Sequence, residues 1–583
     1  MAKPVNTQIL LNGSPILVNS NYSIELEQQI ASHHKLTITC PTESMEDVAG
    51  SFAMKAKDYI GNRLTLLINE DQLVFTSVVV NVNIHKYDGG DGLMVITAFS
   101  PTVLMAHGRD SQSFEKKDLK GIISEATKEY PSDIVKIESK PHFQDSIPYT
   151  VQYKENDFDF ICRLAKRYGE WVYYDGETLH FGNHGSDTVP LNFGEALSEF
   201  NFSMQAKPQH HTYLVYDSLQ AKIHNASMED HRESVSNPYI RDITKVSEKL
   251  FAKKPTAVYN NSLLENGKVE LENVVKLKAK HALNTMVFEG KSDEVQVALG
   301  NLVEVTGKST SVAGQTDVYG NYIITSVTHK VNNSGEYINT FEGVPSDIQV
   351  PVYFDEDAIP VCEEQYAEVK DNNDPDGLGR IRVQFPWQAL NNQLSPWLRV
   401  STPYAGDGKG FHVLPEVGEE VLIGFESGNA EKPFVIGAMF HGKGKSGRGG
   451  AGNYVKGLTT ASGTKVEMDD ENSTVTIYDP SGNTVTLNGD GTITIAAPDK
   501  IDIQSKEINI TGEDKVVIST KSAEVTGTEI VSVNSNSVIE NNSGDKVSIG
   551  AETLVEVGSK AGNVNVTGGN MTNIKGNSSL NLN

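Results

Sequence analysis

A short pattern repeats through residues 460–583, and it limits the possible folds more than any other feature of this sequence. Triplets with apolar side chains at their first and third positions start 7 to 10 residues apart, with Gly, Asn, Asp, Ser and Lys between them. Each three-residue strand buries only two side chains, so the segment cannot build an ordinary core and must be stabilised by stacked repeats. The triplets are residues 475–477, 485–487, 493–495, 501–503, 508–510 and 516–518; after a less regular stretch through Val525, Val531 and Val538 they resume at 547–549, 555–557 and 564–566.

Two architectures fit a period near eight residues. One is a single-chain solenoid with three strands in each coil of about 24 residues, and the other is a prism of three intertwined chains. Roughly thirteen strands at ~4.8 Å spacing would give a thin rod about 60 Å long. In the prism, the interior is expected to be formed by the triplet side chains Val485, Leu487, Ile493, Ile495, Ile501, Ile503, Ile508, Ile510, Val516 and Ile518.

The whole chain of 583 residues is long enough for about four domains. Residues 1–350 combine β-rich runs with three amphipathic helical patterns, at 115–130, 156–168 and about 271–286, and predict a β-dominated α+β domain. Residues 351–371 are acidic and predict a linker. In residues 372–441, strict alternation places Ile381, Val383 and Phe385 on one strand face, and five short strands predict a small barrel of the OB type. A glycine-rich linker, 442–459, precedes the repetitive β needle of residues 460–583.

Charge and motif content argue against nucleic-acid binding and catalysis. With 50 Lys and Arg against 76 Asp and Glu, the formal net charge of −26 repels DNA, RNA and anionic membrane surfaces. The sequence has no HExxH or GxSxG motif, and the glycine-rich linker lacks the first glycine of a phosphate loop because that position is Met439. The cysteines, Cys40, Cys162 and Cys362, lie far apart, which predicts three buried free thiols. We therefore expect no catalytic residues, no cofactor and no metal.

The histidines and the N-terminus point to no other function. The pairs His33–His34 and His210–His211, and His224 with His231, have no carboxylate or cysteine partners at metal-ligand spacing, so we expect surface or packing roles. The N-terminus lacks the apolar segment of a signal peptide, and no stretch reaches eighteen apolar residues. These features predict a chain that is made and folded in the cytoplasm.

Four motifs stand out along the chain: residues 149–164 (YTVQYKENDFDFICRL), 374–387 (DPDGLGRIRVQFPW), 415–428 (PEVGEEVLIGFESG) and 433–437 (PFVIG). In this order they resemble those of the VgrG spike proteins of type VI secretion systems. The resemblance spans nearly the whole chain. It implies a phage-tail-hub-like domain of β-barrels with inserted helices, an OB-fold domain, and a C-terminal trimeric intertwined β-helix, or β-prism. The expected fold class is therefore a β-dominated multidomain α+β protein.

The same resemblance implies a function. In this family three chains form the spike at the tip of a contractile injection machine, seated on a Hcp-type hexameric tube within the baseplate components. The spike punctures target membranes while carrying a PAAR-type tip protein and secreted effectors. We expect the same homotrimer and partners here, and cytoplasmic assembly followed by secretion or injection through the apparatus without a signal peptide. The alternatives are the spike of an extracellular contractile injection particle or phage tail and, less favoured, a spike with hydrolase activity.

The end of the chain predicts a docking surface. A three-chain rod ends in a face of unpaired strand edges, which invite another β element. The final triplet, 580–582, starts two periods after Val564, and the last eight positions carry no charge. Following the resemblance, we expect the PAAR-type cap to bind the tip residues Ser578, Ser579, Leu580, Asn581, Leu582 and Asn583.

Overall fold

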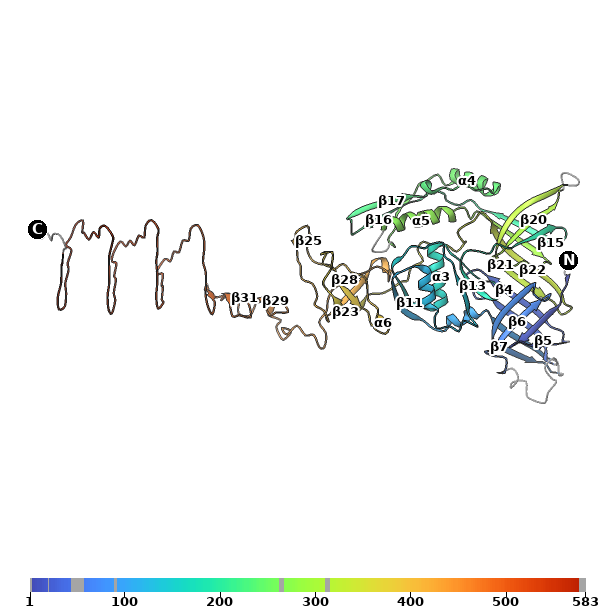
Figure 1. Ribbon diagram of the computed structural model, residues 1–583, viewed down its shortest axis with the longest axis horizontal. Coiled ribbons are helices and arrows are strands. Elements are labelled where there is room, and N and C mark those ends of the chain that lie inside the picture. Colours follow the sequence, from blue (N-terminus) through green and yellow to red (C-terminus); the bar gives the residue numbers. More distant parts are fainter. Residues whose placement is uncertain are drawn as a thin grey trace. The chain divides into compact units, whose positions relative to one another are not determined.

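The computed structural model describes residues 3–18, 20–42, 57–88, 92–261, 267–309 and 315–575 (Figure 1). The chain divides into two units, one of residues 1–480 with 486–493 and one of residues 481–485 with 494–583. Among the described residues, one sheet of the first unit has fourteen strands, in the order β1 (Lys3–Pro4), β22 (Glu336–Pro345), β19 (Met286–Ser292), β15 (Leu197–Met204), β14 (Thr188–Phe193), β20 (Leu302–Lys308), β21 (Thr316–Val331), β4 (Ser23–Gln29), β5 (Lys35–Pro41), β8 (Gly92–Phe99), β7 (Leu73–Lys86), β6 (Arg63–Ile68), β2 (Thr7–Leu11) and β3 (Ser14–Ile16).

This sheet joins the two ends of the N-terminal domain (residues 1–350). Strand β21 pairs antiparallel with β4, so that Ser326 lies opposite Gln29 and Val331 opposite Ile24. Strand β21 also pairs with β22, which closes β22, β19, β15, β14, β20 and β21 into a barrel. In Figure 1 the blue strands of the first hundred residues lie beside the yellow-green strands β21 and β22.

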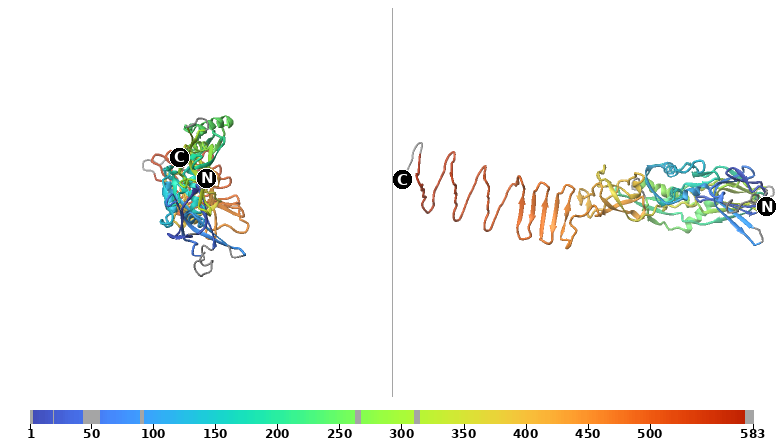
Figure 2. Two further views of the ribbon diagram at one scale, coloured as in Figure 1. Left: turned by 90° about the vertical axis from the view of Figure 1, so that its right-hand side faces the viewer. Right: turned by 90° about the horizontal axis from the view of Figure 1, so that it is seen from below.

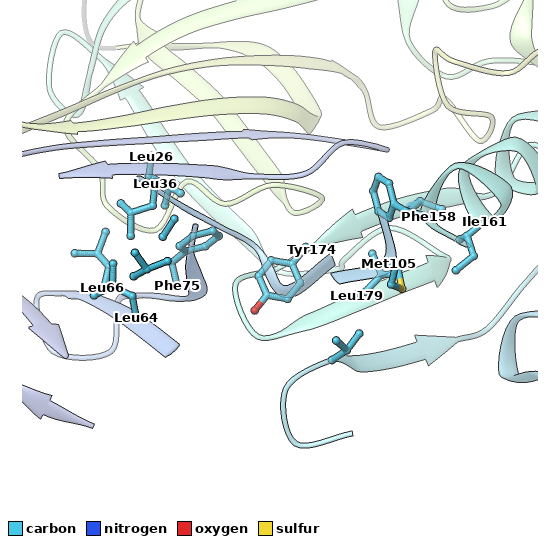
Figure 3. Close-up of a cluster of buried hydrophobic side chains, with 14 of the residues drawn as sticks. Leu26, Leu36, Leu64, Leu66, Phe75, Met105, Phe158, Ile161, Tyr174 and Leu179 are labelled. Carbon is cyan, nitrogen blue, oxygen red and sulfur yellow. The ribbon is translucent and has the colours of Figure 1, made fainter. Parts of the chain in front are cut away.

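Alternating apolar side chains fill the two cores of the fourteen-stranded sheet. The first lies between the early strands, where Leu26, Leu36, Leu64, Leu66 and Phe75 are fully buried (Figure 3). The second fills the closed barrel with stacked aromatic rings; the ring centroids of Phe288 and Tyr322, for example, are 4.3 Å apart. Strands with one buried face produce this arrangement because successive side chains point to opposite sides of the sheet.

Two buried histidines lie at the β21–β4 joint and share one glutamine. Gln28 Nε2 donates to His34 Nδ1 at 3.2 Å, and His329 Nε2 donates to Gln28 Oε1 at 3.2 Å. The Tyr337 hydroxyl donates to His329 Nδ1 at 2.6 Å. Burial lowers the pKa of His34 to about 4 and the pKa of His329 to about 3. Both rings are therefore neutral at neutral pH.

We expect acid to weaken this joint. In the unfolded chain both histidines titrate near 6.5, above their folded pKa values, so the unfolded state takes up protons first as the pH falls. The contribution of the two histidines to the free energy of unfolding is complete above about pH 6.5. It is lost as the pH falls toward their pKa values in the folded protein. Between pH 7.5 and pH 5 the free energy of unfolding should fall by about 2 kcal/mol per histidine. Urea titrations at pH 7.5 and pH 5 measure this decrease in the free energy of unfolding. His329→Gln should halve the decrease. Equal stability of the unsubstituted protein at both pH values would contradict the prediction.

Helices α2 (Leu119–Ala126) and α3 (Asp157–Tyr168) fill the space beside a two-stranded sheet of β9 (Asp110–Lys117) and β11 (Ile147–Glu155). Asn156 caps α3 by accepting a hydrogen bond from Asp159 N at 2.8 Å, and Gly169 ends the helix with φ of 68°. The predicted helix at 156–168 is confirmed. Nearby are the 3-10 helix η2 (Pro101–Ala106) and a sheet of β10 (Lys136–Ser139), β12 (Trp171–Tyr174) and β13 (Thr178–Gly182).

A smaller sheet contains β16 (Thr212–Asp217), β17 (Lys222–Ser227) and β18 (Thr256–Val258), with α5 (Gly267–His281) packed on it and the 3-10 helix η3 (Met228–His231) beside it. Helix α5 begins and ends earlier than the predicted 271–286. Helix α4 (Pro238–Leu250) was not predicted, although Ile240, Ile243 and Val246 recur at helical spacing and Asn237 caps its start; only Ile240 and Ser247 are buried in it.

The OB domain, residues 365–438, has a sheet of β24 (Arg382–Gln384), β23 (Gln365–Asp371), β27 (Glu420–Phe425) and β28 (Pro433–Ala438). It also holds a hairpin of β25 (Ala405–Gly406) and β26 (Lys409–Gly410), with α6 (Pro386–Ala389) and the 3-10 helix η4 (Glu426–Gly428). The predicted inward face is confirmed, since Ile381, Val383 and Phe385 are at most 1% exposed. The predicted acidic linker, 351–371, ends earlier than expected, because Ala367 and Val369 of β23 are buried in this core.

Strands also begin earlier than expected at the glycine-rich segment. Residues 442–459 were predicted as linker, but β29 (Val455–Thr459) pairs antiparallel with β30 (Lys465–Asp469), which pairs with β31 (Thr474–Tyr478). Strands β32 (Thr484–Leu487) and β33 (Ile493–Ala496) follow. Cys40, Cys162 and Cys362 are buried and free, as predicted. Among the described residues, no helix combines the length and apolar character needed to span a membrane.

Candidate functional site: the domain junction and the repeats

A buried ion cluster fastens the OB domain to α3. Glu431, just before β28, is 1% exposed at its side chain and lies between Arg163 and Arg167 of α3. Its carboxylate pairs with Arg167, lies 3.7 Å from Arg163 Nη1 and accepts a hydrogen bond from the Thr150 hydroxyl. Arg167 also pairs with Glu270 of α5 at 2.9 Å. One cluster therefore holds α3, α5 and the OB domain together.

The charges of this cluster depend on one another. Burial alone would lower the pKa of Arg167, but Glu431 and other neighbours raise it well above its ordinary value. Burial raises the pKa of Glu155, opposed by Arg163, whose Nε donates to it at 2.7 Å. A buried ion pair adds little net stability, yet removing one partner leaves an uncompensated charge. The cluster thus makes the junction sensitive to single substitutions.

Aromatic side chains complete the junction. The Trp387 ring stacks on Phe385 with centroids 5.2 Å apart and lies 6.3 Å from the ring of Tyr153 in β11. Its Nε1 donates to Gln365 Oε1 at 3.0 Å. These contacts give the tryptophan a packing role at the junction.

The DPDGLGR motif builds a turn held by one carboxylate. Asp374 accepts hydrogen bonds from Arg380 Nε at 3.0 Å and Arg380 Nη2 at 2.7 Å, and from the backbone N–H groups of Asp376, Leu378 and Arg380. These bonds, those from Arg380 above all, hold the pKa of Asp374 well below its ordinary range. Gly377 and Gly379 have φ of 66° and 71°, a conformation that favours glycine. The motif therefore shapes the loop that enters β24.

Replacing Asp374 by asparagine should destabilise the OB domain. The change removes the buried charge partner of Arg380, whose side chain is 9% exposed, and turns one acceptor into a donor facing backbone N–H groups. We expect a loss of about 2–4 kcal/mol in the free energy of unfolding, measured by urea titration with tryptophan fluorescence. Asp376→Asn is the control: this carboxylate also pairs with Arg380, but it is 67% exposed and should matter little. Similar losses in the two variants would contradict this account.

The predicted trimer-core residues are exposed in the single chain. Val485 is half-buried, and the other nine are 45% to 80% exposed: Leu487, Ile493, Ile495, Ile501, Ile503, Ile508, Ile510, Val516 and Ile518. The described residues 497–575 include no assigned strand and run as extended segments joined by bends (Figure 2). The triplets therefore form an apolar row that this chain does not cover.

The structure extends the repeat through the stretch that looked irregular in sequence. Bends occur every 7 to 9 residues, at Lys506, Glu513, Lys521, Thr528, Asn536, Gly544, Glu552, Lys560 and Gly569. Val531 and Ile539 each lie three residues after the start of a bend, as Val516 does. Ile539, rather than Val538, therefore occupies the apolar position of the repeat. The predicted tip residues, Ser578, Ser579, Leu580, Asn581, Leu582 and Asn583, lie outside the described residues.

Two of the six histidines that the sequence analysis named have carboxylate neighbours that the sequence spacing did not show. His210 Nδ1 lies 2.7 Å from Glu229 Oε1, and His224 Nε2 lies 3.7 Å from Asp217 Oδ2. Among the described residues, no three His, Cys, Asp or Glu side chains come together as a metal site. Sequence reasoning also missed Glu431 and Arg167; the available signal was the spacing of Arg163 and Arg167, four apart on a mostly buried helix.

Two family models match the chain. Residues 44–335 match the phage tail baseplate hub (GPD) model, and residues 365–440 match the type VI secretion system/phage-baseplate injector OB domain, which confirms the predicted OB fold. The type VI secretion system spike protein VgrG4b of Pseudomonas aeruginosa is 24% identical over 333 residues, or 50% of this chain and 39% of that protein. VgrG5 of the same organism is 41% identical over 69 residues, covering 11% of this chain and 9% of that protein. The chain thus spans well under half the length of these relatives.

A solved structure supports the fold. The Francisella PdpA-VgrG complex aligns with a TM-score of 0.53 at 10% identity, over 85% of this chain and 80% of that chain. The hub model alone covers half of the sequence. The chain belongs to the phage tail baseplate hub (GPD) family, among the VgrG-type spike proteins.

Proposed function

We propose that three copies of this chain form the spike of a contractile injection system, with a mechanical rather than a catalytic role. The observation that carries the proposal is the row of exposed valines and isoleucines along residues 493–566. A row of this length is costly in water, and the bends place its members at nearly constant intervals, so that identical rows from three chains can cover one another.

The single-chain solenoid is the competing arrangement. A solenoid would pair successive strands of one chain, whereas the described residues 497–575 hold no strand pairing. This difference favours the intertwined prism over residues 497–575, and we propose that the predicted core residues of that stretch face its axis. The first four of the ten, Val485, Leu487, Ile493 and Ile495, belong to strands β32 and β33 of a sheet.

The partners follow from the family. We propose that the N-terminal domain is seated on a Hcp-type hexameric tube among baseplate components, and that the needle carries a PAAR-type cap on its tip and effectors to the target cell. A solved VgrG is in a complex with another protein, PdpA, which supports the carriage of further proteins. The assembled spike would leave the cytoplasm through the contractile apparatus and puncture the target membrane.

Native mass spectrometry of the full chain tests the assembly. We expect three times the chain mass of 63.6 kDa for the full chain, and a loss of the trimer when residues 460–583 are deleted. Hydrogen exchange in β23 and β27 serves as the control that the deletion leaves the OB domain folded. A full chain that remains a monomer would refute the proposed prism.

A further inference from the structure

The outward face of the OB sheet carries an apolar patch. Tyr366 of β23 lies opposite Leu422 of β27, and Phe434 and Ile436 belong to the neighbouring strand β28. Successive side chains of a strand point to opposite faces of a sheet, and the inward ones form the OB core. Tyr366 is 58% exposed and Ile436 is 41% exposed, while Leu422 and Phe434 are partly buried. We call these four residues the OB patch.

A glycine under the OB patch lets two of its side chains lie flat on the sheet. Gly424 of β27 lies opposite Phe434. A Cβ atom at this glycine would be 2.8 Å from Phe434 Cζ and 2.9 Å from Ile436 Cδ1, closer than side chains approach one another. Phe434 and Ile436 therefore pack across the glycine. The patch is a preformed surface, and covering such a surface costs little conformational entropy.

Charged side chains bound the OB patch on the same face. Glu368, two residues after Tyr366, lies opposite Glu420, and Lys370 pairs with Glu368 at 2.6 Å. An exposed apolar patch beside polar residues is typical of a contact between proteins. Two facing carboxylates repel the phosphates of lipids and nucleic acids, so a protein surface is the class of partner that suits this face.

The chain itself brings copies of this face together. Strand β28 is the last strand of the OB domain, and the segment 439–454 leads from it to β29. Fully extended, these sixteen residues reach at most about 55 Å. In the proposed spike three such segments start from one needle, so the three OB domains are held within this reach of one axis. Tethers of this length give effective concentrations in the millimolar range, at which a weak apolar contact forms.

We propose that the OB patch of each copy packs against the OB domains of the other two copies, so that contacts between chains begin before the needle. The inference rests on the proposed function, which supplies the other copies. It goes beyond that function because the row along residues 493–566 can assemble the needle without any contact between OB domains. A free protein has no tether of this kind, and a neighbouring copy is therefore the occupant that the chain favours.

Maleimide labelling of single introduced cysteines in the full chain tests the contact. Ile436→Cys and Tyr366→Cys report on the OB patch, and Leu390→Cys, at a position that is 90% exposed, is the control. The native cysteines are buried. In the native protein the two patch cysteines should react at least tenfold more slowly than in urea, whereas Leu390→Cys should react within threefold of its rate in urea. Native mass spectrometry of the same samples gives the number of chains.

A second substitution separates cover by a neighbouring copy from cover by the chain itself. Ile436→Glu, added to Tyr366→Cys, places a charge in the OB patch at an exposed position. It should bring the labelling rate to within threefold of the rate in urea, while the needle keeps the mass at three chains. Leu390→Glu, added to Tyr366→Cys, is the matched control and should leave the slow labelling unchanged.

The mass and the labelling rate separate this inference from the proposed function. A trimer whose patch cysteines react as fast as Leu390→Cys would overturn the inference and leave the trimeric spike standing. A trimer in which Tyr366→Cys still reacts slowly after Ile436→Glu would also overturn it, because the cover would not depend on the OB patch. A monomer would refute the trimeric spike and, with it, the neighbouring copy as the occupant.

Discussion

Replacing Ile501 by aspartate is expected to abolish the three-chain needle. In the prism, the three copies of this residue meet near one axis, so the variant would place three carboxylates together in an apolar interior. Each buried, unpaired carboxylate costs at least about 2 kcal/mol, and mutual repulsion adds to this. We expect the native mass to fall from three chains to one, and any resistance of the trimer to SDS to be lost.

Asp502→Asn is the matched control for this substitution. The neighbouring side chain points to the opposite side of the extended segment and pairs with Lys500 at 2.8 Å, with both side chains more than half exposed. Its replacement should leave the trimer intact. If Ile501→Asp instead kept its mass and its SDS resistance, the assignment of the triplet residues to the interior would be wrong.

Replacing Glu431 by glutamine should uncouple the OB domain from the N-terminal domain. The change keeps the size of the side chain but removes the buried charge that Arg167 and Arg163 share. Loss of one partner of a buried pair costs about 3–5 kcal/mol, and the remaining contacts of Arg167 with Glu270 and Arg163 with Glu155 place this case near the lower figure. In urea, the single unfolding transition of the unsubstituted protein should become two transitions in Glu431→Gln. Tryptophan fluorescence measures this unfolding.

Glu368→Gln in β23 is the control for Glu431→Gln. Its carboxylate pairs with Lys370 at 2.6 Å but is 53% exposed, so the substitution should change stability by less than about 1 kcal/mol. A Glu431→Gln protein that unfolds in a single transition at the unchanged urea concentration would show that packing around Trp387, rather than the ion cluster, couples the domains.

The sequence predicted those features that depend on neighbouring residues. Helix α3, with its cap at Asn156 and its end at Gly169, follows from a 3.6-residue apolar period, and the inward face of the OB strand at Ile381 and Val383 follows from alternation. The same local logic located the repeats. It overlooked α4, whose apolar residues do recur at helical spacing, and it failed at β23, where acidic residues on the outer face hid the buried Ala367 and Val369.

The features of the candidate sites also divide into those that the sequence predicted and those that only the structure shows. The sequence by itself determined the period of the needle and the apolar side chains that make the row, because both are properties of adjacent residues. Only the tertiary structure decided that β4 pairs with β21, that Glu431 enters between two arginines of α3, and that Ser113 of β9 contacts Gln393 of the OB domain. These contacts join residues more than 250 positions apart, and their partners are selected by sheet closure and by the burial of opposite charges, which no local pattern records.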